Sequence, residues 1–155
     1  DEIEWCRNEL RAKERRSLKE ISARDALLAD AYRDTLATRL TATRIIKSSK
    51  RELQLMQRRQ QKLKQLGTQS SKDFQETLAR DIAKIDSINE EAKVMLAEAE
   101  TRLQMVEAAS VRGSAVADSE LILKKLSARA TELPLALEEA KMAEEIRAEL
   151  EKEGQ

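Results

Sequence analysis

Apolar side chains recur along most of the chain with an alternating spacing of three and four residues, the pattern of α-helices that pack along one face. The first such stretch extends from about Ile3 to Leu66. Asp25, Arg39 and Gln60 interrupt its seam, while further leucines and isoleucines beside the seam widen the apolar face. A face of this width predicts contact with more than one neighbouring helix. The apolar seam positions are Leu18, Ile21, Leu28, Tyr32, Ala42, Ile46, Leu53, Met56 and Leu63.

The second stretch extends from about residue 72 to residue 110 and carries the most regular seam of the chain. Asn89 is the polar position in its interior. A buried Asn can fix the register of two helices, whereas an Asn at the edge of a seam is reached by water. The sequence leaves both interpretations open. The apolar seam positions are Leu78, Ile82, Ile85, Ala92, Leu96, Ala99, Leu103 and Val106.

The third stretch extends from about residue 115 to residue 153 and contains the only proline of the chain, Pro134. Proline inside a helix removes a hydrogen bond, so it predicts either a kink or the first turn of a new helix. After a small phase shift, Ala143, Ile146 and Leu150 are expected to continue the seam. The preceding seam positions are Val116, Leu123, Leu126, Ala130, Leu133, Leu137 and Ala140.

Two short segments, Gly67–Ser71 and Ser110–Ser114, separate the three stretches. Each combines a glycine that can end a helix with serines that can begin the next one. Connections of about five residues join antiparallel helices in bundles. We therefore expect an all-α fold, an elongated antiparallel (up-down-up) three-helix bundle or coiled coil, with residues 1–155 as a single module. The expected helices cover about 3–66, 72–110 and 115–153, and the first is long enough to overhang the others in part.

Composition supports long helices over disorder. The chain has 3 Gly, 1 Pro and 2% aromatic residues, so it can form few turns and no thick aromatic core. Disordered chains usually combine low hydrophobicity with a large net charge. This chain is 41% hydrophobic and carries no formal net charge.

Charge is divided unevenly along the chain. Residues 1–66 have an excess of Lys and Arg, and residues 67–155 have a matching excess of Asp and Glu. Folding back would place the basic stretch 39–64 beside acidic helices, which favours pairing within the chain. A basic face that binds an anionic membrane is the alternative, whereas nucleic acid is disfavoured because this stretch lacks aromatic side chains for stacking. The candidate residues for an anionic surface are Arg44, Lys47, Arg51, Arg58, Arg59 and Lys62.

The N-terminal end carries a short apolar stripe of its own. Ile3, Cys6 and Leu10 follow the three-four spacing, and Trp5 lies beside them. An exposed apolar stripe invites a partner. We expect these four residues to bind another protein chain.

The residue types needed for common catalytic sites are absent or isolated. The chain has no His and a single Cys, and it has no glycine-rich phosphate loop. Without His or a second Cys, neither a structural zinc site nor a His-activated nucleophile can be assembled. We therefore expect no enzymatic activity, no catalytic residue, no bound metal and no cofactor. The lone Cys indicates the cytoplasm or another reducing compartment, and the start at Asp1 suggests a fragment or a processed product.

Together these patterns predict a non-catalytic coiled-coil module that spaces or assembles protein partners through its seams. Self-association is consistent with the wide face of the first helix. One alternative is a peripheral membrane module that uses the basic stretch. Another is a helical-hairpin adaptor that docks through the tip at Gly67–Ser71.

Overall fold

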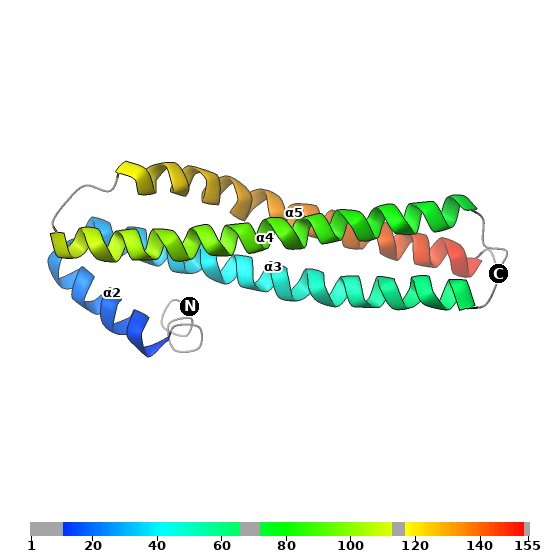
Figure 1. Ribbon diagram of the computed structural model, residues 1–155, viewed down its shortest axis with the longest axis horizontal. Helices are drawn as coiled ribbons and strands as arrows, with labels where there is room; N and C mark the ends of the chain where they lie inside the picture. The colour runs from blue at the N-terminus through cyan, green and yellow to red at the C-terminus, as the bar shows by residue number, and fades with distance from the viewer. Residues whose placement is uncertain (1–10, 66–71, 113–116, 154–155) are drawn as a thin grey trace. The chain divides into compact units, whose positions relative to one another are not determined.

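The fold is all-α. The computed structural model describes residues 11–65, 72–112 and 117–153, and their secondary structure consists of four helices with no strand. The helices are α2 (Ala12–Arg24), α3 (Ala26–Gln65), α4 (Lys72–Arg112) and α5 (Ala117–Glu153), as Figure 1 shows. The chain divides into two compact units, each described by itself below. Unit 1 comprises Asp1–Ala42 and Met95–Ala130, and unit 2 comprises Thr43–Val94 and Thr131–Gln155.

The first predicted helix is interrupted. Asp25 has an extended backbone between α2 and α3, and its carboxylate accepts hydrogen bonds from the N–H groups of Leu27 (2.9 Å) and Leu28 (3.3 Å). An Asp at this position satisfies N–H groups that a new helix leaves open. The break lets α2 fold back along α3 (Figure 1), where Glu14 contacts Arg39. The helix expected over about 3–66 is therefore divided into α2 and α3 within its described part, and α2 packs on α3 instead of forming an overhang.

The core of unit 1 is formed by side chains from α2, α3 and α4. Leu18 and Ile21 of α2 pack with Tyr32 and Leu36 of α3 and with Leu103 of α4. Most of these residues lie at predicted seam positions, so burial of the seam accounts for the contact of the three helices. α3 and α4 are antiparallel in this unit, because Tyr32 contacts Glu107 and Thr35 contacts Arg102.

Unit 2 is held together by contacts among α3, α4 and α5. Its buried apolar residues again fall mostly on the predicted seams. Pro134 is half-buried inside α5, so no new helix begins there. The expectation of one module over residues 1–155 stays a prediction. Among the described residues of this unit, the buried apolar side chains are Ile45, Met56, Leu78, Ile85, Ile88, Ala92, Leu133, Leu137 and Ala140.

Candidate functional site

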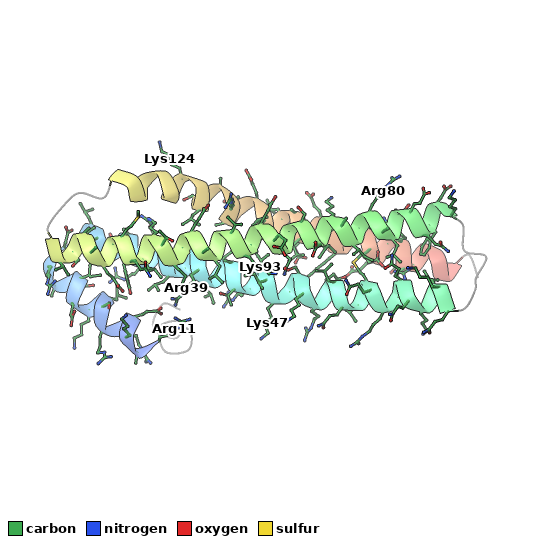
Figure 2. The ribbon with its side chains drawn as sticks, viewed as in Figure 1. Arg11, Arg39, Lys47, Arg80, Lys93 and Lys124 are labelled. Carbon is green, nitrogen blue, oxygen red and sulfur yellow. The ribbon has the colours of Figure 1, made fainter. Side chains whose placement is uncertain are left out.

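A basic face runs along the outward side of α3 in unit 2. Four of the six predicted residues for an anionic surface lie on it, and all four are exposed. None of the four makes an ion pair with another described residue. Figure 2 shows Lys47 projecting from α3 on the side away from α4. Leu55 lies among them and is 52% exposed. Because their spacing is three or four residues, they share one helix face. We call Lys47, Arg51, Leu55, Arg58 and Lys62 the basic face.

The other two predicted basic residues differ from these four. Arg44 is exposed but engaged in an interaction. Arg59 points inward, where its guanidinium pairs with Glu144 of α5 and lies 5.4 Å from the ring centre of Phe74. Arg59 therefore joins α3, α4 and α5 and is not part of a basic surface.

Glu144 stands at the centre of a group of charges in the interior of unit 2. Besides Arg59, it accepts a hydrogen bond from Arg147 at 3.4 Å, and Arg147 also pairs with Asp81 of α4. Burial, followed by the positive charge of Arg59, lowers the pKa of the Arg147 guanidinium. Two carboxylates thus hold two guanidinium groups and connect all three helix segments of this unit.

The end of α5 presents a second exposed face. Ala143 and Ile146, expected to continue the interior seam, are exposed, while Glu144 is buried in their place. The predicted phase shift was wrong: the seam continues from Ala140 to Glu144 without a shift, because Arg59 and Arg147 neutralise that carboxylate. The side chain of Leu150 is outside the described part. We call Leu135, Glu138, Glu139, Met142, Glu145, Ile146 and Glu149 the acidic face.

Asn89 is buried and is 6% exposed. Its Nδ2 donates hydrogen bonds to Ser49 Oγ (2.8 Å) and to the Ile46 carbonyl (3.2 Å), both on α3. Of the two interpretations left open by the sequence, the buried one is confirmed. Since another register would leave this amide without acceptors, Asn89 aligns α3 with α4 in unit 2.

Unit 1 also buries charged groups. Glu14 and Arg39 pair between α2 and α3, and Glu100 of α4 lies 3.7 Å from Arg39. The Arg102 side chain is almost wholly buried and donates to Thr35 Oγ1 and to the Ala31 carbonyl. These contacts place each guanidinium against oxygen acceptors, which a buried charge requires.

Tyr32 is fully buried, and its hydroxyl donates a 2.8 Å hydrogen bond to Glu107. Burial and the Glu107 carboxylate raise the pKa of this phenol far above its ordinary value of 10.0. The neutral phenol therefore favours folding below pH 10, and this contribution is lost as the pH rises above the ordinary pKa toward the raised one.

We expect the phenolate absorbance at 295 nm to appear well above pH 10 in the folded protein. Because the chain has a single tyrosine, the signal has one source. The same titration in concentrated urea supplies the control, and its midpoint should lie at about pH 10, the ordinary pKa of a solvated tyrosine. Coincident titration curves with and without urea would show that Tyr32 is solvated.

Each unit contains a small cavity lined by described residues. One, of about 300 Å³, lies between the end of α3 and the start of α4 and is lined by Leu63, Leu78 and Ala79 with polar side chains at its edge. The other, of about 140 Å³, is bordered by Glu14, Tyr32 and Glu107. Glu14, Tyr32 and Glu107 at the second cavity are already engaged in the contacts described above. Among the described residues, no group of three or more His, Cys, Asp or Glu side chains is placed to hold a metal ion.

Two predicted sites fall outside the described residues. These are the N-terminal stripe of Ile3, Trp5, Cys6 and Leu10, and the tip at Gly67–Ser71. Sequence reasoning missed the buried charges of Glu14, Arg102 and Glu144 and the partly buried charge of Arg147. For Glu144 a signal existed, since it follows Ala140 by four residues, the spacing of the seam.

Comparisons with known proteins give no relative from which a role could be transferred. Among the described helices, none combines the length and apolar character needed to cross a membrane. No protein-family description matches the chain, and no curated protein or solved structure is significantly similar to it.

Proposed function

We propose that this chain is a non-catalytic helical interaction module that holds or spaces protein partners. The observation that carries the proposal is the pair of exposed faces on unit 2, in which one apolar side chain on the basic face and three on the acidic face lie among charges of one sign. Large contiguous apolar patches on a protein surface, especially those with a polar rim, mark interaction sites. Here Leu55 lies within the basic face, while Leu135, Met142 and Ile146 lie within the acidic face.

The proposed architecture is an antiparallel, coiled-coil-like bundle of α3, α4 and α5. Contacts within unit 2 support it: Asn89 joins α4 to α3, Arg59 joins α3 to α5 through Glu144, and Arg147 joins α5 to α4. In such an arrangement each helix buries one stripe and leaves another facing outward. The outward stripes are the surfaces available to a partner.

Site-specific photo-crosslinking tests the proposed function. Benzoylphenylalanine replaces Gln54 beside the basic face or Ala143 beside the acidic face, and the control replaces the exposed Ala83 of α4. After irradiation in an extract of the source cells, we expect discrete protein adducts from the first two positions and none from Ala83. Absence of a protein adduct at both faces would contradict the proposal.

A peripheral membrane role is the second candidate, because the basic face carries four exposed cations in one line. Lys and Arg side chains close to an anionic bilayer surface contribute about 1 kcal/mol each to binding. Cosedimentation with phosphatidylserine vesicles distinguishes the two roles. Salt-sensitive binding that the combined changes Arg51→Glu, Arg58→Glu and Lys62→Glu abolish would favour the membrane over a protein partner. The adaptor that docks through Gly67–Ser71 stays a further alternative.

A further inference from the structure

The acidic face of α5 has the composition of one half of a helix–helix contact. Its centre is apolar, with Leu135 61% exposed, Met142 59% exposed and Ile146 57% exposed. Exposed glutamates flank this centre on both sides, and of these Glu138 alone has an ion-pair partner among the described residues, Lys141 at 3.9 Å. Flanking charges of this kind select the partner of an apolar seam. The fitting partner is a helix with an apolar centre and basic flanks.

The basic face of α3 has this complementary composition. Leu55 supplies the apolar centre, and Arg51 and Arg58 lie on the adjacent turns on either side of it. At a rise of 1.5 Å per residue, the basic face from 47 to 62 and the acidic face from 135 to 149 are each about 21–23 Å long. The two faces are therefore matched in length and opposite in charge. Both stay exposed within the chain, so neither covers the other.

We propose that the acidic face of one copy of this chain binds the basic face of a second copy. The inference rests on the proposed function and specifies its partner. Packing of Leu55 against Met142 and Ile146 removes these side chains from water. The Lys and Arg side chains of the basic face then lie opposite the glutamates of the acidic face and form ion pairs with them. Since each copy carries both faces, two copies can satisfy each other reciprocally about a two-fold axis, or successive copies can join head to tail. The flanking ions are solvated, so association weakens with salt.

Sedimentation equilibrium with charge-swap variants tests this contact. One variant carries Arg51→Glu and Arg58→Glu, and the other carries Glu138→Arg and Glu145→Arg. We expect the unaltered chain to exceed its monomer mass of 17.6 kDa, with the excess lost in high salt. In each variant alone, like charges oppose one another, and the dissociation constant should rise by about tenfold or more.

Mixing the two variants provides the decisive measurement. The reversed charges of one variant then face the reversed charges of the other, so opposite signs meet again across the contact. We expect association to return in the equimolar mixture. The matched control, Arg80→Glu with Lys84→Glu, reverses two exposed charges of α4 and should leave association intact. Figure 2 shows Arg80 projecting away from the ribbon. Circular dichroism checks that every variant remains helical.

Three results would overturn the inference: an unaltered chain that stays monomeric in low salt, a mixture that fails to associate, or a control that dissociates as readily as the face variants. The photo-crosslinking result separates this failure from that of the proposed function. Adducts to a different protein together with a monomeric mass would reject self-association and retain the interaction module. Absence of adducts together with a monomeric mass would reject both.

Discussion

Replacing Glu144 with alanine is expected to lower the free energy of unfolding by about 3 kcal/mol, the scale measured when one partner of a buried ion pair is removed. The Glu144 side chain is 9% exposed and holds Arg59 and Arg147. Its loss leaves two guanidinium groups with Asp81 as the remaining carboxylate of the group. Urea denaturation followed by circular dichroism measures the change.

The matched control for this change is Glu91→Ala, which removes an exposed glutamate from α4 of the same unit. An exposed carboxylate contributes about 0–1 kcal/mol to stability, so the free energy of unfolding of the control should stay close to that of the unaltered chain. Equal effects of Glu144→Ala and Glu91→Ala would mean that Glu144 is solvated and that the three helix segments are not joined through it.

Replacing Glu14 with alanine is also expected to lower the free energy of unfolding by about 3 kcal/mol, because it removes one partner of a buried ion pair. Glu14 and Arg39 are each about 10% exposed or less at the side chain, and the pair fastens α2 to α3. After the change, Glu100, which is 42% exposed and 3.7 Å away, is left as the partly solvated partner of Arg39. Urea denaturation again gives the magnitude.

The exposed Glu20 of the same helix supplies the control, since Glu20→Ala removes an equal charge without opening a buried pair. A double change provides a stricter test. Replacing both partners, Glu14→Leu with Arg39→Met, should recover much of the loss, because a buried pair can be exchanged for apolar side chains at little net cost. A double variant that is no more stable than Glu14→Ala would contradict this account.

Glu14 also gives unfolding an acid dependence with a defined sign. Burial acts to raise the pKa of its carboxyl, but the hydrogen bond and charge of Arg39 outweigh burial and lower the pKa below its ordinary value of 4.5. A lowered pKa stabilises the folded state above the ordinary value, and the contribution disappears as the pH falls through the lowered one. Stability should therefore drop more steeply with acid below pH 4.5 in the unaltered chain than in Glu14→Gln.

Much of the helical pattern could be predicted from the sequence because apolar spacing reports the buried face directly. The seam through Leu78, Ile85, Ala92 and Ala99 is buried in α4 as expected. This spacing is a property of one helix alone, so it predicts the buried face of that helix whichever neighbour covers it. The basic face was predictable in the same way, since its charges follow one helix stripe.

The break at Asp25 and the buried charges could not be predicted by the same reasoning. In the sequence, Asp25 is one polar residue that interrupts a seam. Only its hydrogen bonds to the N–H groups of Leu27 and Leu28 show that a new helix begins there. Glu144 and Arg59 are 85 residues apart, so their mutual neutralisation depends on tertiary contact. Without knowledge of that contact, a glutamate is assigned to solvent and Ile146 to the interior, which is the reverse of their positions.

The buried ion pairs also affect how the helix contacts respond to heat. Hydration of charged groups becomes less favourable as temperature rises, so the penalty for removing them from water decreases. The stabilisation from apolar burial instead levels off on heating. The ion pairs of Glu14 and Glu144 should therefore contribute a larger fraction of the stability of the helix contacts as the temperature rises. This contribution helps an interior with few aromatic side chains to stay folded on heating.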